Sequence, residues 1–427
     1  MDIFNTIAKE AQRQRASVNL IASENAVSDN VLRAMGSVLT NKYAEGYPGA
    51  RWYGGCKFTD EIEAYAIEKA KKLFGAEHAN VQPHSGTSAN IAAYMTLLEP
   101  GDKVLAFNLS HGGHLSHGAA FNISGKFYKF VHYGVNRETG LIDVDEIHRL
   151  FKEHRDIKLM IAGASSYPRT IDFAQLAGIA REYGAMFMAD IAHISGLVAA
   201  GLHPSPVGVA DMVTMSTHKT IRGPRGGMVL CPEKHRKKLD RAVFPGSQGG
   251  PLEHVIAAKA VMLEEASKPE FKAYIAEVLA SAKALTKALT DINPTRYRVI
   301  SGGTDNHMVM VDVTGGLLSS PSGGGGESGH SREGGNPAPA ASTATGLTGK
   351  SAEDLLGSQN IYVNKNFIPY DPLPNTVTSG LRLGTPMLVT QGARASDMPR
   401  IAELVDAALS GKDVRADVAA FMERLGG

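Results

Sequence analysis

Short apolar runs alternate with longer helical stretches through the middle of this 427-residue chain. Residues 103–107, 159–163, 185–190, 212–216 and 227–231 have the composition of strands, and stretches such as 88–98 and 173–183 have that of helices. This alternation predicts an α/β layer fold with a large, mixed but mostly parallel sheet. Ligands of such folds bind beyond the carboxyl ends of the strands. Candidate functional residues are therefore sought where the strands end.

Two regions flank the predicted sheet domain. Residues 264–289 read as one long helix, followed by strand-like pieces at 297–301 and 308–313 and then by further helix. We expect an N-terminal arm over residues 1–67, a large domain over 68–264 and a smaller C-terminal α+β domain over 265–427. A length of 427 residues fits two or three domains at about 150 residues each.

Residues 319–342 differ from the rest of the chain. They contain no Val, Ile, Leu or Phe and are dominated by Gly, Ser, Pro and Ala. Such a segment buries too little apolar surface to offset its ordering entropy. We expect a disordered insertion, and its sequence specifies no role.

Charge and composition exclude several classes of protein. The chain has 44 Lys and Arg against 43 Asp and Glu, so no overall field attracts nucleic acid or an anionic membrane. No apolar run reaches the roughly 18 residues of a membrane span, and residues 1–11 do not resemble a signal peptide. The two cysteines, Cys56 and Cys231, form no disulfide framework and fit a reducing compartment. We expect a soluble, cytoplasmic protein.

The segment 214–227 (TMSTHKTIRGPRGG) is the most informative one. An apolar strand ends in hydroxyl residues, which are followed by His218, Lys219 and a Gly-Pro turn. A lysine at the end of a buried strand loses hydration in its charged form, and enzymes use this cost to make an amine that forms a Schiff base. The alternative is a lysine that merely extends into solvent.

Asp190 closes the preceding predicted strand and should lie at the same edge of the sheet. An aspartate that pairs with a pyridinium nitrogen, together with a lysine that forms an aldimine, is the protein's part in pyridoxal phosphate chemistry. Taken alone, Asp190 is equally well explained as the N-cap of a helix.

Ser85, Gly86 and Thr87 follow a strand-like segment, 79–82, and precede a helix expected to begin near Ala89. Backbone N–H groups and hydroxyls at a helix N-terminus suit a phosphate dianion, although such a motif is often only a cap. In combination with Asp190 and Lys219, it favours a pyridoxal phosphate site.

Two other segments are dense in functional groups. Residues 43–55 form a turn-rich loop with aromatic side chains, and residues 108–118 hold His111, His114 and His117 among glycines. A metal site is the alternative for the histidines, but no Cys or carboxylate with ligand spacing accompanies them. We therefore expect no metal and interpret one imidazole as stacking on the pyridine ring.

Taken together, these motifs resemble the serine hydroxymethyltransferase family. The resemblance covers about residues 14–392 apart from 319–342, and it rests on the segments 20–25 (LIASEN), 41–49, 81–86, 111–118, 217–220 and 244–251 (FPGSQGGP). It implies a fold-type I, aminotransferase-like architecture and a homodimer with shared active sites, with a tetramer as the alternative. The implied reaction is the reversible transfer of the serine hydroxymethyl group to tetrahydrofolate through a pyridoxal 5'-phosphate aldimine, giving glycine and methylene-tetrahydrofolate.

The resemblance also implies roles for individual residues. The implied catalytic residues are Lys219, Glu45, His114, Asp190, His193 and Tyr53. The implied cofactor-binding residues are Ser85, Gly86, Thr87, His114, Ser165, Asp190, His193, His218, Lys219, Gly249, Gly250 and Tyr43. Arg382 and Ser23 are implied to bind the amino acid carboxylate, with Tyr53 and Glu45 completing the substrate site. Folate contacts are implied for Trp52, Leu109, Gly113, Asn364 and Asn366.

One departure from the family concerns folate. Trp52 stands where the family usually has tyrosine, so aromatic stacking is kept while a phenol hydrogen bond is lost. A folate-independent pyridoxal phosphate aldolase acting on threonine-like or α-methylserine substrates is the alternative function, because such an enzyme shares nearly the same pocket chemistry. A protein that has lost its chemistry is the third hypothesis, against which stand the intact Lys219, Asp190, Glu45 and Arg382.

Overall fold

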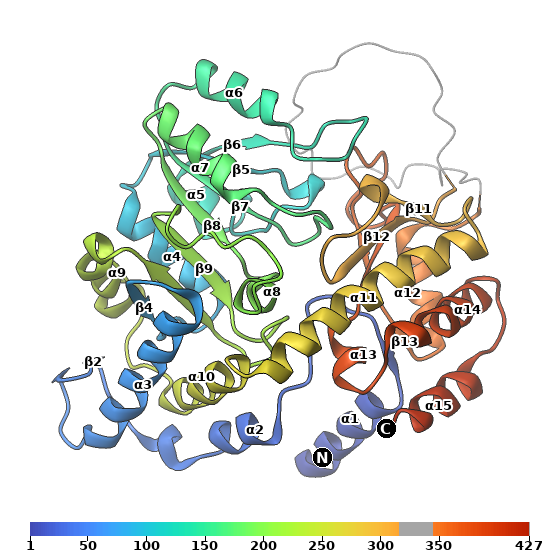
Figure 1. Ribbon diagram of the computed structural model, residues 1–427, viewed down its shortest axis with the longest axis horizontal. Helices are drawn as coiled ribbons and strands as arrows, with labels where there is room; N and C mark the ends of the chain where they lie inside the picture. Colours follow the sequence, from blue (N-terminus) through green and yellow to red (C-terminus); the bar gives the residue numbers. More distant parts are fainter. Residues whose placement is uncertain (316–344, 427) are drawn as a thin grey trace.

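The computed structural model describes residues 1–315 and 345–426, and its central element is a seven-stranded sheet with the strand order β4–β10–β9–β8–β7–β5–β6 (Figure 1). The strands are β4 (His78–Asn80), β5 (Lys103–Phe107), β6 (Lys129–Tyr133), β7 (Ile157–Gly163), β8 (Met186–Asp190), β9 (Met212–Ser216) and β10 (Gly227–Cys231). All neighbours from β9 to β6 are parallel, and only β10 runs antiparallel to the strands beside it. The predicted α/β fold with a mixed, mostly parallel sheet is confirmed.

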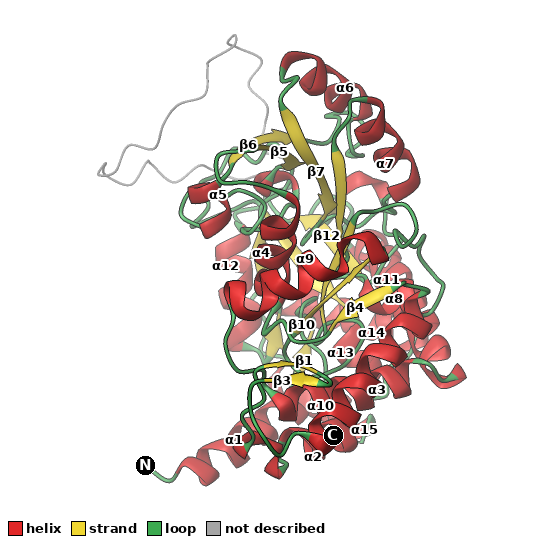
Figure 2. Ribbon diagram, turned by 90° about the vertical axis from the view of Figure 1, so that its left-hand side faces the viewer, coloured by secondary structure: helices red, strands yellow, loops and turns green. Residues whose placement is uncertain are grey.

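Strand side chains alternate between two apolar layers, as the period of two in a β-strand requires. In β5, Leu105 and Phe107 belong to one layer, whereas Val104 and Ala106 belong to the other. The first layer packs against α2 (Asp29–Met35), α3 (Lys57–Phe74), α6 (Val144–Glu153), α7 (Phe173–Glu182), α8 (Ser195–Ala199) and α10 (Glu253–Ala266). The second packs against α4 (Gly86–Leu97) and α9 (Arg236–Arg241), and the short α5 (Ile123–Phe127) precedes β6. Helices therefore cover both faces of the sheet (Figure 2).

The C-terminal part of the chain builds a second, smaller layer structure with its own core. Its antiparallel sheet has the order β11–β12–β15–β14, formed by β11 (Arg298–Val299), β12 (Met308–Asp312), β14 (Asn364–Asn366) and β15 (Gly380–Gly384). The helices of this part are α11 (Pro269–Ile292), α12 (Gly349–Ser358), α13 (Pro386–Thr390), α14 (Met398–Leu409) and α15 (Arg415–Arg424). Figure 1 shows α11 running from the neighbourhood of α10 to the small sheet.

The N-terminal residues are divided between the two parts. After α1 (Ile3–Arg15), the strand β1 (Val18–Asn19) pairs with β13 (Ile361–Tyr362), and Val18 and Leu20 lie in the core of the small part. In contrast, α2 and α3 pack on α10 of the large part. Helix α3 passes residue 67 without a break. A short hairpin of β2 (Gly46–Tyr47) and β3 (Ala50–Arg51) precedes it.

Several predicted boundaries are wrong. The single helix expected over 264–289 is two helices, because Pro269 begins α11 and the residue before it, Lys268, is extended with ψ 152°. A proline disfavours the helical conformation of its predecessor. Helix α4 begins at Gly86, three residues before the expected start, and the strand expected over 297–301 is reduced to β11. The insertion expected to be disordered, 319–342, lies outside the described residues.

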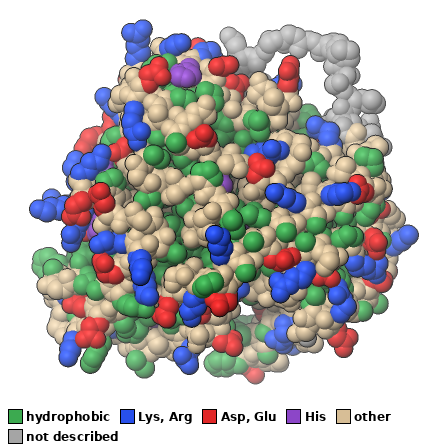
Figure 3. Space-filling view, viewed as in Figure 1, with side chains coloured by type: hydrophobic (Ala, Val, Ile, Leu, Met, Phe, Trp, Pro, Cys, Tyr) green, Lys and Arg blue, Asp and Glu red, His purple; other side chains and the backbone are tan. Residues whose placement is uncertain are grey.

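Figure 3 shows Lys and Arg interspersed with Asp and Glu on one face, without a field of a single sign. Among the helices of the described residues, none is both long and apolar enough to cross a membrane.

Candidate active site

A cavity of about 340 Å³ lies where the carboxyl ends of β7, β8 and β9 meet the N-terminus of α4. It collects a large share of the predicted site residues: Ser23, Ser85, Gly86, Thr87, His114, Ser165, Asp190, His193, His218 and Lys219. Its position agrees with the rule that α/β sheets bind ligands beyond the carboxyl ends of their strands.

Asp190 ends β8 with a fully engaged carboxylate. Its Oδ2 accepts hydrogen bonds from the Nδ2 of Asn90 at 2.9 Å and the Nε2 of His117 at 3.0 Å, and its Oδ1 accepts one from the N–H of Ala192 at 2.9 Å. Burial by itself would raise the pKa of Asp190, but hydrogen bonding and charge from His117 hold this pKa well below its usual range. Asp190 is not a helix N-cap, because the next helix begins only at Ser195. The carboxylate of Asp190 is therefore negatively charged at neutral pH.

Lys219 lies three residues beyond β9, in a loop with a fixed course. The Nδ2 of Asn25 donates to the carbonyl of Lys219 at 2.9 Å, and the N–H of Arg222 donates to the same carbonyl at 3.1 Å. Burial lowers the pKa of the Lys219 amine to about 8, against the opposing influence of Asp190. About a tenth of this amine is then unprotonated at pH 7, far more than for a lysine with an ordinary pKa, and the unprotonated form is the nucleophile.

Three of the four histidines that line the cavity have a lowered pKa and are neutral at neutral pH. Burial lowers the pKa of His114 to about 4 and that of His218 to about 3, and it places the pKa of His193 well below its usual value. The described residues contain no group of three or more His, Cys, Asp or Glu that could hold a metal ion. These imidazoles are therefore available for stacking and hydrogen bonding.

The N-terminus of α4 is packed tightly against the neighbouring strands. Ser85 caps the helix by accepting from the N–H of Ser88 at 3.1 Å, and a Cβ on Gly86 would lie 3.1 Å from the Oγ of Ser216. A Cβ on Gly227 would lie only 2.1 Å from the carbonyl oxygen of Ser85. The first N–H groups of a helix have no partner within it, so Gly86 and Thr87 offer donors for an anion.

Arg382, on β15 of the small part, does not itself line the cavity but contacts Ser165, which does. Its Nη1 donates to the carbonyl of Ser165 at 2.7 Å and its Nε to the Oδ1 of Asn364 at 3.1 Å. Burial lowers its pKa to about 10, so the guanidinium is still charged at neutral pH. Asn366, on β14, donates to the Oγ of Ser166 at 3.1 Å.

The remaining predicted residues do not line this cavity. Leu109 and Gly113 lie on the turn after β5, and the loop residues Tyr43, Glu45, Trp52 and Tyr53 form a separate group with Gly249 and Gly250. Within that group, the hydroxyl of Tyr43 donates to the Oε1 of Glu45 at 3.3 Å, and Glu45 and Trp52 line a second, open hollow. The three aromatic side chains are between 47% and 78% exposed.

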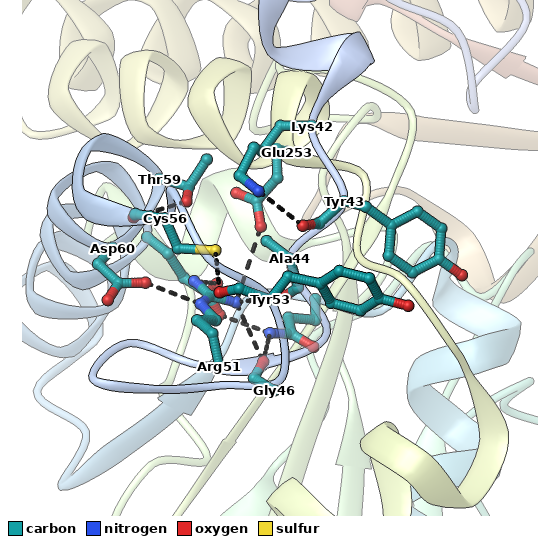
Figure 4. A network of polar contacts seen from close by, with 12 residues as sticks. Lys42, Tyr43, Ala44, Gly46, Arg51, Tyr53, Cys56, Thr59, Asp60 and Glu253 are labelled. Atoms are coloured by element: carbon teal, nitrogen blue, oxygen red, sulfur yellow. Dashed lines mark hydrogen bonds and ion pairs between the residues drawn. The ribbon is translucent and has the colours of Figure 1, made fainter.

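The loop is anchored by Arg51, whose guanidinium contacts Asp60 at 2.8 Å (Figure 4). The same guanidinium contacts Glu63 at 2.6 Å. Its Nη1 also donates to the carbonyls of Ala44 and Gly46. Figure 4 shows the rings of Tyr43 and Tyr53 on the same side of the loop, directed away from Arg51.

Several functional candidates escaped the sequence analysis. Asn90 lies one turn into α4, and the contacts of its side chain with Asp190 and with the Oγ of Ser116 have no local sequence signal. Lys259 is buried and donates to the carbonyls of Val81, Pro83 and Gly227, beneath the start of α4. His307 contacts His193 from the small part. The sequence shows a histidine cluster at 111–117, but the contact of His117 with Asp190 joins two distant segments and has no local signal.

The cavity fits pyridoxal phosphate in its donor set. A charged carboxylate suits a pyridinium nitrogen, a buried amine suits an aldehyde, and a helix N-terminus suits a phosphate. The volume also lies within the range of small-molecule sites. Fold and site together define a pyridoxal phosphate-dependent enzyme of fold type I.

The family model described as serine hydroxymethyltransferase matches residues 1–321 and 341–405. The chain therefore belongs to the serine hydroxymethyltransferase family, whose members are pyridoxal phosphate-dependent one-carbon transferases that use tetrahydrofolate as co-substrate.

Proposed function

We propose that this protein transfers the hydroxymethyl group of serine reversibly to tetrahydrofolate, giving glycine and methylene-tetrahydrofolate. The observation that carries the proposal is the pairing of a buried amine at Lys219 with a charged carboxylate at Asp190, both lining one cavity in a chain of this family. Bound pyridoxal phosphate supplies an electron sink that weakens the bonds at the α-carbon of the amino acid.

The residues of the cavity hold the cofactor in this proposal. Lys219 binds its aldehyde carbon, and Asp190 keeps its ring nitrogen protonated. Ser85, Gly86 and Thr87 bind its phosphate with the N-terminus of α4. His114, Ser165, His193 and His218 complete the cofactor site by stacking and hydrogen bonding.

Arg382 and Ser23 bind the carboxylate of the amino acid. The planar guanidinium offers two parallel donors, which a carboxylate accepts as a bidentate pair. The buried setting of Arg382 supports this role, because a charge-assisted hydrogen bond is stronger where water is excluded. Holding the carboxylate orients the bond that breaks.

A second copy of the chain supplies the remaining groups. Glu45, Tyr43 and Tyr53 carry exposed or half-exposed side chains away from their own cavity, as expected for residues that enter a neighbour's site in a homodimer. Glu45 there handles the proton of the serine hydroxyl, and Gly249 and Gly250 approach the cofactor's phosphate. The folate is faced by Trp52, Leu109, Gly113, Asn364 and Asn366.

We also propose a cytoplasmic location for the protein. Its two cysteines are free thiols, as expected in a reducing compartment.

A substrate panel tests this function. Purified holoenzyme is assayed with serine, threonine-like substrates and α-methylserine, each with and without tetrahydrofolate. Serine cleavage that depends on tetrahydrofolate is expected, whereas equal rates in its presence and absence would overturn the proposal in favour of a folate-independent aldolase. Borohydride reduction followed by peptide mapping should place the cofactor on Lys219, with Lys219→Arg as the matched control.

A further inference from the structure

His307 is a fully buried histidine at the junction of the two parts of the molecule. It directly precedes β12, whose first residue, Met308, pairs with Gly384 on the strand that carries Arg382. The residues just before it are bound to the large part. The N–H of Asp305 donates to the carbonyl of Pro168 at 2.8 Å, and the Nδ2 of Asn306 donates to the carbonyl of Tyr167 at 3.0 Å. His307 is thus held in place from both sides.

The side chain of His307 contacts one histidine of the active-site cavity. Its Nε2 lies 3.3 Å from the Nδ1 of His193, and the two ring planes are only 17° apart. His193 is 3% exposed and His307 is 0% exposed. Because one ring must donate and the other accept, the hydrogen bond requires that the two histidines are not both protonated.

The electrostatic surroundings keep this pair neutral. Burial is the largest influence on both side chains, and it lowers the pKa of His307 to about 3 and that of His193 well below its usual value. The positive charges of Lys219 and Arg382 act on both in the same direction. A neutral imidazole has one nitrogen with a proton and one without, so the partner of one nitrogen decides the state of the other.

The contact with His307 occupies the Nδ1 of His193. The Nε2 of His193 is therefore the nitrogen that remains to bind a ligand in the cavity. We propose that His307 is a positioning residue, which fixes the ring orientation and the proton arrangement of His193 toward the bound cofactor. The inference rests on the proposed function only in that His193 contacts pyridoxal phosphate. His307 itself does not line the cavity.

Two substitutions test the role of the His307 ring nitrogen. His307→Leu removes the partner of His193, and His307→Gln keeps an amide that can donate or accept at a similar reach. For the leucine variant we expect a shifted visible absorption maximum of the holoenzyme, weaker binding of pyridoxal phosphate and a kcat lowered about tenfold or more, with the KM for serine little changed. The glutamine variant should restore the spectrum and most of kcat.

His203→Gln is the matched control, because His203 is also buried but does not line the cavity and contacts only residues outside it, Ile171 and Pro204 among them. It should leave the spectrum unchanged. If the leucine variant does not fold, His307→Asn takes its place, since the shorter amide withdraws from His193 without removing polarity. A leucine or asparagine variant with the wild-type spectrum, cofactor affinity and kcat would overturn the inference.

A double substitution separates this inference from the proposed function. If His307 acts through His193, the variant with both His193→Ala and His307→Leu should be no more impaired than His193→Ala alone. Losses that add would assign His307 a separate role and overturn the proposal. If His193→Ala alone leaves the spectrum and kcat unchanged, the role of His193 in the proposed function fails instead.

Discussion

The Nε2 of His117 lies 3.0 Å from the Oδ2 of Asp190, and both side chains are largely buried where they line the cavity. Burial alone would favour a protonated Asp190, and His117 reverses this preference. The negative charge of Asp190, at the end of β8, therefore depends on His117 from the segment between β5 and α5 and on Asn90 of α4.

Replacing His117 by asparagine should remove this support. We expect the pKa of Asp190 to rise and kcat to fall by about tenfold or more, because the ring nitrogen of the cofactor loses a fully charged partner. Since its pKa is lowered in the folded protein, Asp190 contributes stability above its unfolded pKa of about 4, which is lost as the pH falls further. Acid unfolding of the cofactor-free variant should therefore begin at a higher pH than in the wild type. His154→Asn, on the C-cap of α6, is the control.

The amine of Lys219 should titrate near pH 8 in the cofactor-free protein. The rate of its modification by an amine-specific reagent should reach half its maximum near this pH, well below that of surface lysines. Asp190→Asn should lower this midpoint, because the charge of Asp190 raises the pKa of Lys219. The unfolded chain keeps the proton up to about pH 10.4, so the contribution of Lys219 to stability rises between pH 8 and that value. A midpoint near 10.4 in the folded protein would contradict the prediction.

Arg382→Lys should impair substrate binding more than folding. The lysine keeps the charge but loses the bidentate geometry, so we expect kcat/KM for serine to fall about 100-fold, which corresponds to roughly 3 kcal/mol. Steady-state kinetics with serine and glycine measure the effect. Arg400→Lys on α14 is the control, since its ion pairs with Glu403 and Asp417 are exposed. Equal kinetics in the two variants would exclude Arg382 from carboxylate binding.

Arg51→Leu should destabilise the loop that carries Tyr43, Glu45 and Tyr53 (Figure 4). The substitution leaves Glu63 and Glu253 buried without their cation. In the wild type, burial and the negative charge of Glu63 raise the pKa of Glu253 to about 7 even with Arg51 present. Breaking one side of a buried ion pair costs about 3–5 kcal/mol. Denaturant unfolding of the cofactor-free protein measures this cost. Arg149→Leu removes only exposed pairs and should leave the unfolding midpoint unchanged.

The sequence predicts the sheet and the cofactor cavity because both depend on local patterns. Apolar strands that end in Asp190 and in the segment before Lys219 must place these residues at one edge of a parallel sheet. In contrast, helix boundaries near Pro269 and Gly86 depend on backbone conformation at single residues, which apolar periodicity does not register.

Contacts between distant segments lie beyond such reasoning. The pairing of His193 with His307 joins residues 114 positions apart, and that of Asn25 with Lys219 joins residues 194 positions apart. Nothing in either local sequence specifies its partner. Likewise, no pattern distinguishes the buried Lys259 from an exposed lysine on an amphipathic helix, because its three carbonyl acceptors come from β10 and from residues 81–83.

Gly227→Ala should weaken cofactor binding although Gly227 itself does not line the cavity. The added Cβ would lie 2.1 Å from the carbonyl oxygen of Ser85 and 3.0 Å from the N–H nitrogen of Gly86, so the backbone at the start of α4 must move. Overpacking of this kind costs about 1–3 kcal/mol. If this cost falls on the phosphate site, the dissociation constant of pyridoxal phosphate should rise about tenfold or more in an absorbance titration.

Gly178→Ala on α7 is the matched control, because its added Cβ meets no atom within 4 Å and alanine favours the helix. That variant should keep the wild-type dissociation constant, and a wild-type constant for Gly227→Ala as well would show that the start of α4 does not bind the phosphate.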